Sequence, residues 1–105
     1  MDLWKAALSV AEGKIDADLG GGVIKQRIAR RGEGKSGGSR VILLFRFKGR
    51  MVFVYGFEKK DKANITPEEL EAFRELAEVI LAYSESEIAA RISDGALIEI
   101  DREEE

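Results

Sequence analysis

The chain has 105 residues, of which 45% are hydrophobic, and a formal net charge of −3, which fits one globular domain with a core of its own. It contains neither cysteine nor histidine, which excludes disulfides and thiolate metal sites and removes the commonest general base. No apolar run approaches the ~18 residues of a membrane span, and the N-terminus lacks signal-peptide features, so we expect a cytoplasmic protein without membrane contact.

The residue pattern in the first third of the chain predicts a helix, a turn and a strand. Residues 3–12 carry apolar side chains at helical spacing on one face. Residues 14–22 form a polar stretch that closes on three glycines, which is typical of a turn. Residues 23–29 alternate with strand periodicity, which puts Lys25 and Arg27 on the same face.

Two more strands are predicted in the middle of the chain. Residues 39–47 include an apolar run at 41–45, which suits a central strand buried on both faces. Residues 51–57 are rich in β-branched and aromatic side chains. A tight turn at 48–50 makes these strands an antiparallel hairpin, and a charged loop at 58–64 follows.

A strong helix start comes next. Thr66 suits the N-cap, Pro67 the first helical position and Glu69 the third, which together form a capping box. An apolar stripe then continues at helical spacing. The pattern predicts a helix over 66–82.

The last part of the chain predicts a second helix and a final strand. Ser84 and Glu87 form another capping box, which starts a helix that ends near Ser93. The alternating residues 96–100 predict a strand after it. The whole pattern predicts a single α+β domain over residues 1–105, with an antiparallel sheet packed against helices.

The glycine-rich stretch 29–40, ARRGEGKSGGSR, contains the GKS that ends a P-loop. A P-loop also needs a glycine five residues before Gly34, where this chain has Ala29, and a helix after it rather than a strand. We therefore exclude a nucleotide clamp. A flexible connector explains the glycines and serines but not the basic residues around them, which are Arg30, Arg31, Lys35 and Arg40.

Charge is divided unevenly along the chain. Residues 1–62 hold 14 Lys and Arg against 7 Asp and Glu, whereas residues 63–105 hold 3 against 13. Residues 25–62 alone hold 12 basic and 3 acidic residues. This division allows a basic face for a polyanion such as RNA. The alternative is a set of independent solvated loops, because strand register decides whether the basic clusters meet.

Three segments carry a family resemblance: LGGGVIKQRIARRGEGKSGGSRVILLFRF, FVYGFEKKDKANITPEEL and DGALIEI. They resemble the RelE/ParE-like toxins of bacterial type II toxin–antitoxin systems, and most closely the HigB-like branch. The combination of GKSGG-x-R with NI-x-x-x-EL is the most specific part. The resemblance covers about residues 15–100.

The resemblance implies a small cytoplasmic toxin that binds the ribosome and cuts mRNA. Its fold would be a small twisted antiparallel sheet flanked by helices. Relatives begin with a further basic and aromatic segment, so this chain would lack the first strand. The partner would be a HigA-like helix-turn-helix antitoxin. The chemistry would need neither a metal nor a small-molecule cofactor, because the RNA 2′-OH attacks the adjacent phosphorus.

The resemblance also assigns site residues. Arg40 matches the arginine that opens the central strand and contacts the scissile phosphate, and Lys60 or Lys59 matches a second basic catalytic residue. Without histidine, the general base would be Asp61 or a lysine whose pKa is lowered by crowding among Lys59, Lys60 and Lys62. The base and the acid stay unassigned. The residues that would hold the RNA backbone are Lys25, Arg27, Arg30, Arg31, Lys35 and Lys62.

Three alternatives remain open at this point. One is a ParE-like toxin directed at gyrase. Another is a catalytically inactive relative that only binds an antitoxin. The last is a small basic RNA-binding domain without toxicity, whose binding would depend steeply on salt.

Overall fold

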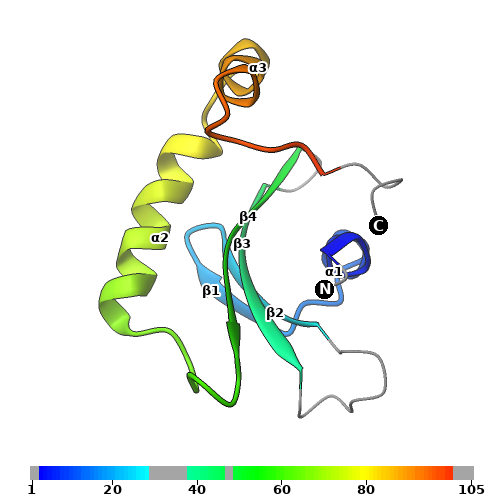
Figure 1. Ribbon diagram of the computed structural model, residues 1–105, viewed down its shortest axis with the longest axis vertical. Coiled ribbons are helices and arrows are strands. Elements are labelled where there is room, and N and C mark those ends of the chain that lie inside the picture. The colour runs from blue at the N-terminus through cyan, green and yellow to red at the C-terminus, as the bar shows by residue number, and fades with distance from the viewer. Residues whose placement is uncertain (1–2, 29–37, 47–48, 101–105) are drawn as a thin grey trace.

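A computed structural model describes residues 3–28, 38–46 and 49–100. It has the α+β architecture expected from the sequence, with a four-stranded antiparallel sheet between helices (Figure 1). The elements in chain order are α1 (Leu3–Ala11), β1 (Ala17–Gly20), β2 (Val23–Ile28), β3 (Ser39–Arg46), β4 (Arg50–Glu58), α2 (Pro67–Ile80) and α3 (Glu85–Ser93).

The strands form a simple meander in the order β1-β2-β3-β4, and each neighbouring pair is antiparallel. The helix α1 covers one face of the sheet and α2 the other, while α3 lies beyond the end of α2 (Figure 1). No helix within the described ranges is both long and apolar enough to cross a membrane.

The core lies in two layers, one on each face of the sheet. Ala6 and Val10 of α1 pack with buried residues of β2 and β3 on one side, and Ala77 and Ile80 of α2 pack on the other. In β3, Val41–Leu44 are all buried, which confirms the predicted central strand. Burial of one such aliphatic side chain stabilises the fold by about 1.5–3 kcal/mol.

A bulge in β4 changes which face its side chains occupy. Leu43 pairs with Phe53 and Ile42 pairs with Tyr55, so Val54 is an extra residue in β4. Phe53 therefore packs on the α1 side, whereas Tyr55, two residues later, is paired with a residue of the α2 side. Such a bulge re-aims the side chains that follow it.

Both predicted capping boxes are confirmed. The Thr66 hydroxyl accepts from the Glu69 backbone N–H at 3.1 Å, and the Glu69 carboxylate accepts from the Thr66 N–H at 2.7 Å. Ser84 and Glu87 make the same exchange at the start of α3. Reciprocal bonds of this kind satisfy N–H groups that have no partner inside the helix.

Two predictions about strands are wrong. The stretch 14–22, expected to be only a turn, contains the short strand β1, which pairs with β2 through Ala17 and Asp18. Three successive glycines with positive φ, 85°, 64° and 87°, then make the tight connection to β2. This strand is short and lies at the edge of the sheet. Its four residues therefore give only a weak alternation of apolar and polar side chains, which does not predict a strand.

The predicted final strand at 96–100 is not a strand. The Leu97 N–H donates instead to the Arg91 carbonyl at 3.0 Å, and the segment runs from α3 past the β4 end of the sheet toward α1 (Figure 1). The segment lines one side of a cavity next to β4 and α1, but only Leu97 is partly buried and Ile98 is 84% exposed. Alternation in sequence therefore predicts neither burial nor strand pairing here.

Candidate nucleic-acid interface

Three of the basic residues on the α2 face of the sheet lie close together. Arg27 of β2 lies directly opposite Arg40 of β3, and Lys25 lies opposite Ile42. Directly paired residues point to the same face, and Ile42 belongs to the core layer under α2. We call Lys25, Arg27 and Arg40 the basic face. The sequence left open whether the basic residues of different strands meet, and the register of β2 and β3 shows that these three share one face.

Aromatic residues border the basic face. Arg40 pairs with Phe57 and Ile42 pairs with Tyr55 across β3 and β4. The Tyr55 ring centroid lies 5.8 Å from that of Phe57 and 5.8 Å from that of Phe73 in α2. Tyr55 is 37% exposed, so its ring is anchored in the core while part of it faces solvent.

The loop between β4 and α2 closes one side of the basic face. The Lys25 Nζ donates to the Asn64 side-chain oxygen at 3.3 Å, and the same oxygen accepts from the Ile65 N–H at 2.9 Å. Asn64 thus ties the end of this loop to β2. Neither Asn64 nor Tyr55 was predicted as a site residue, since only the register of β4 brings them to Lys25.

Lys62 is bound by a carboxylate. Its Nζ lies 2.6 and 2.7 Å from the two Glu69 carboxylate oxygens and 5.5 Å from the centroid of the Tyr55 ring. The hydrogen bond to Glu69 raises the pKa of Lys62, against a smaller effect of burial, and the same bond lowers the pKa of Glu69. Lys62 is therefore not a lysine whose pKa is lowered by crowding, because its nearest charge is opposite in sign.

Arg27 is held at two points by Asp16. The Arg27 backbone N–H donates to Asp16 Oδ2 at 2.6 Å, and Nη2 of the same residue donates to Asp16 Oδ1 at 3.3 Å. Burial by itself would raise the pKa of Asp16, but the hydrogen bonds from Arg27 and the charges of Arg27 and Arg40 together lower it. Asp16 is another site residue that the sequence did not indicate.

Arg40 is half-buried at the start of β3. Its Nη1 lies 3.4 Å from the Gly38 carbonyl oxygen and 3.5 Å from that of Ser39. On the opposite face, the Ser39 hydroxyl donates to the Glu58 carboxylate at 3.0 Å. This bond joins β3 and β4 at the end where the basic face lies.

The predicted catalytic residues Lys59, Lys60 and Asp61 form the turn that follows β4. All three are exposed, and the Asp61 N–H donates to the Glu58 carbonyl at 3.0 Å. Because Arg40 pairs with Phe57 near the end of β4, this turn lies at the same end of the sheet as Arg40. The predicted RNA-binding residues Arg30, Arg31 and Lys35 lie outside the described residues.

Two other basic residues of the 25–62 stretch serve the fold instead. Arg46 Nη1 donates to the Leu81 carbonyl at 2.7 Å, and Arg50 Nη1 donates to the Ile80 carbonyl at 2.8 Å. These bonds satisfy carbonyls at the C-terminal end of α2. The charge of the stretch is therefore only partly available to a ligand.

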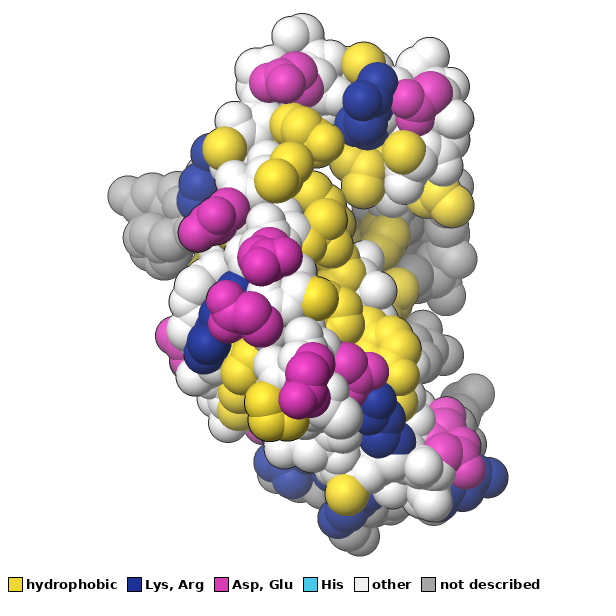
Figure 2. All heavy atoms as spheres, turned by 90° about the vertical axis from the view of Figure 1, so that its left-hand side faces the viewer, with side chains coloured by type: hydrophobic (Ala, Val, Ile, Leu, Met, Phe, Trp, Pro, Cys, Tyr) yellow, Lys and Arg dark blue, Asp and Glu magenta, His cyan; other side chains and the backbone are white. Residues whose placement is uncertain are grey.

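Acidic and basic residues are unevenly distributed on the surface. Figure 2 shows acidic side chains along α2 and a group of Lys and Arg side chains below them, toward the end at which α2 begins, while further Lys and Arg side chains lie beside and above the acidic ones. Within the three described ranges, no group of three or more Asp or Glu residues could hold a metal ion.

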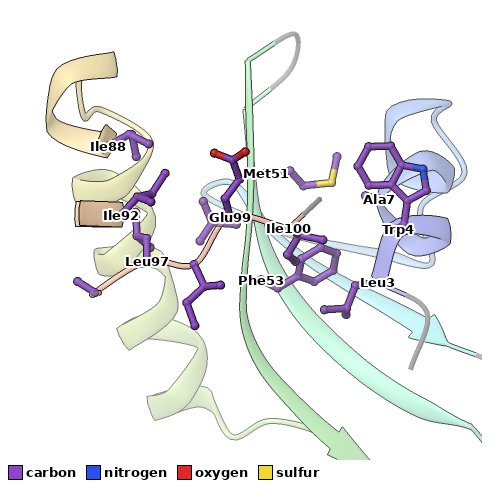
Figure 3. A pocket seen from close by; sticks show the side chains of 13 residues that line it. Leu3, Trp4, Ala7, Met51, Phe53, Ile88, Ile92, Leu97, Glu99 and Ile100 are labelled. Carbon is purple, nitrogen blue, oxygen red and sulfur yellow. The ribbon is translucent and has the colours of Figure 1, made fainter. Parts of the chain in front are cut away.

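A cavity of about 690 Å³ lies at the other end of β4 (Figure 3). Side chains of Leu3 and Trp4 from α1, Met51 and Phe53 from β4, and the segment 96–100 converge on it. Of the described residues that line it, only Glu99 carries a charge. Among these described lining residues a phosphate would find no cation, so we place the candidate interface on the basic face.

Of three comparisons with known proteins, one gives a match. No curated protein and no solved structure gives a significant match. Residues 1–100 match the family described as the RelE toxin of the RelE / RelB toxin-antitoxin system. The chain therefore belongs to the RelE toxin family.

Proposed function

We propose that this toxin is an endoribonuclease of the HigB-like branch that cleaves mRNA on the ribosome. The observation that carries the proposal is the direct pairing of Arg27 with Arg40, with Lys25 two residues along on the same face. Paired guanidinium groups suit a phosphodiester, because each presents several N–H donors to phosphate oxygens.

The proposed reaction needs charge stabilisation and proton transfer. The 2′-OH attacks the adjacent phosphorus and the bond to the 5′-oxygen breaks, which leaves a 2′,3′-cyclic phosphate and a 5′-hydroxyl. Arg40 and Arg27 would stabilise the charge that develops on the phosphate oxygens. One group must take the 2′-OH proton and another must protonate the leaving oxygen.

Tyr55 adds a proton-transfer candidate to those predicted from the sequence. Its ring is fixed by Phe57 and Phe73, and a phenol can both donate and accept a hydrogen bond. Lys60, Lys59 and Asp61 are exposed at the same end of the sheet. We assign one half of the acid–base pair to Tyr55 and leave the other half to the turn 59–61.

A RelE-family toxin has an antitoxin as its partner. We propose that this antitoxin is a HigA-like helix-turn-helix protein, and that the ribosome and mRNA are the targets. The observation that tests the antitoxin is the reading frame next to this one. A helix-turn-helix protein encoded there that binds this chain and blocks its activity is the expected finding.

The enzymatic proposal is tested by adding the purified chain to translating ribosomes and mapping mRNA ends. We expect discrete cuts by the wild type and at least about a hundredfold fewer with Arg40→Ala. Intact mRNA with the folded wild type would contradict the proposal. Broken DNA with whole mRNA would favour gyrase as the target instead.

A further inference from the structure

We propose that Asp16 is a positioning residue that holds the Arg27 guanidinium beside Arg40, and that the buried Gln26 holds Asp16. This inference rests on the proposed function for its consequence but not for its geometry. It concerns Asp16, on the segment before β1, and Gln26 of β2, neither of which was predicted to act at the site.

Asp16 binds two different groups of Arg27. One carboxylate oxygen accepts a hydrogen bond from the backbone N–H of Arg27 at 2.6 Å, and the other accepts one from the Arg27 guanidinium at 3.3 Å. The bond from the backbone N–H fixes the carboxylate next to β2, and the bond from the guanidinium then restricts the rotamers of the Arg27 side chain. The carboxylate therefore selects one direction for a guanidinium that is 43% exposed and would otherwise move freely in solvent.

Gln26 fixes the course of the segment that carries Asp16. Its Oε1 accepts from the Asp16 backbone N–H at 3.0 Å, and its Nε2 donates to the Lys14 carbonyl at 2.9 Å. Gln26 is 5% exposed and lies between the buried Ile24 and Ile28 on the same face of β2. A buried amide is costly unless it is hydrogen-bonded. Here the amide is hydrogen-bonded at both ends, to the backbone of Lys14 and of Asp16 on either side of Ile15.

The pairing of Arg27 with Arg40 explains why the site needs a carboxylate beside these two residues. Like charges directly opposite each other on neighbouring strands repel, so Arg27 and Arg40 would turn away from each other into solvent. The charges of both arginines act on the Asp16 carboxylate. An anion beside the pair offsets the repulsion and keeps two guanidinium groups available to one phosphate.

The first test compares Asp16→Asn with the control Asp18→Asn. Asp18 is an exposed carboxylate on the same hairpin that accepts from the Gly20 N–H at 3.0 Å. We expect Asp16→Asn to bind a single-stranded RNA oligonucleotide as tightly as wild type or tighter, because an anion has been removed. Its single-turnover cleavage on programmed ribosomes should nevertheless fall about ten- to a hundredfold. A merely structural or bystander carboxylate would not give slower cleavage with undiminished binding.

The second test is a double-mutant cycle with Gln26→Met, which keeps the size of the side chain. If Gln26 acts through Asp16, Gln26→Met slows cleavage in the wild-type background and has little effect in Asp16→Asn. Equal slowing of cleavage in both backgrounds would overturn the proposal that Gln26 acts through Asp16. Urea unfolding of each variant measures how much protein is folded in the assay.

A readout without RNA separates this inference from the proposed function. In NMR relaxation, the Arg27 Nε–Hε group should be ordered in the wild type and in Asp18→Asn, and should become mobile in Asp16→Asn. Unchanged order in Asp16→Asn would overturn the positioning role even if the protein cleaves RNA. A wild type that is ordered at Arg27 but never cleaves would overturn the proposed function and leave the positioning of Arg27 standing.

Discussion

Arg27 on β2 lies directly opposite Arg40 on β3, on the face of the sheet that α2 covers. Two cations at such a position weaken the sheet unless a ligand or a neighbouring anion compensates them. Asp16 compensates Arg27 in the free protein. The remaining positive charge is what a phosphodiester would neutralise, and the predictions below follow from this arrangement.

Replacement of Arg40 by glutamine should lower the cleavage activity without lowering the stability of the fold. Because Arg40→Gln removes one of two opposed cations, the free energy of unfolding should stay the same or rise by about 0.2–1 kcal/mol. Cleavage should fall about 10²- to 10³-fold, as for the loss of one charge-stabilising donor. Urea unfolding and single-turnover cleavage measure the two effects. The matched control is Arg91→Gln on α3, and a comparable loss of cleavage in that control would argue against a specific role for Arg40.

The hydroxyl of Tyr55 can be removed without disturbing the ring. Tyr55→Phe keeps the contacts with Phe57 and Phe73, so the unfolding transition should move little. Loss of one acid or base should slow cleavage by about 10²-fold or more. Tyr83→Phe at the end of α2 is the control. An unchanged rate for Tyr55→Phe would return the acid–base roles to Lys60, Lys59 and Asp61.

The pair of Lys62 and Glu69 predicts a pH dependence of stability. The pKa of Glu69 is lowered from 4.5, chiefly by the hydrogen bond from Lys62 and next by that from Thr66. A depressed carboxyl pKa stabilises the fold above the unfolded value, and this stabilisation is lost as pH falls through the folded value. Glu69→Gln keeps a capping acceptor but loses the charge.

The difference in unfolding free energy between wild type and Glu69→Gln should therefore be largest near neutral pH and should shrink below pH 4.5. Urea titrations from pH 3 to pH 7 measure it. Glu78→Gln, on the exposed side of α2, serves as the control. A difference that stays constant or grows on acidification would contradict the assigned pairing.

Lys25 provides a test of how RNA is held. Its ammonium group lies on the basic face, 3.3 Å from the Asn64 oxygen, and an exposed ammonium on this face contributes mainly charge. Lys25→Gln should weaken RNA binding similarly for different sequences and reduce the slope of log K against log salt by about 0.7. Lys14→Gln, before β1, is the control. An unchanged slope would place the RNA elsewhere.

Residue pattern predicts much of this fold because burial and capping leave local signals. The apolar run at 41–45 has the composition of a strand covered on both faces, and β3 is that strand. Thr66 and Ser84 start helices because each has a Glu at the third helical position. These features depend on neighbours close in sequence.

The features that sequence does not predict depend on pairing between distant segments. The strand β1 has a mixed pattern because only part of it is covered. Residues 96–100 alternate like a strand but line a largely apolar cavity instead, with Ile98 exposed. The bulge at Val54 has no marker in sequence, yet it turns Tyr55 toward the basic face.

The same limit applies to the site. Lys25, Arg27 and Arg40 were predicted as functional, and alternation places the first two on one face, but only the register of β2 and β3 shows that Arg40 shares it. Asp16 was missed because its partner lies eleven residues away across a hairpin. The roles of Lys59, Lys60 and Asp61 stay predictions, since charge and resemblance alone carry them.

The most direct test of the central claim uses two mRNAs that differ by one oxygen. One has ribose throughout, and the other has a single 2′-deoxy nucleotide on the 5′ side of a mapped cut. On programmed ribosomes, the wild-type chain should cut the first to a 2′,3′-cyclic phosphate and leave the second whole at that position, although both bind. Cleavage of the 2′-deoxy mRNA at the same position and rate would contradict attack by the 2′-OH and the role proposed for the basic face.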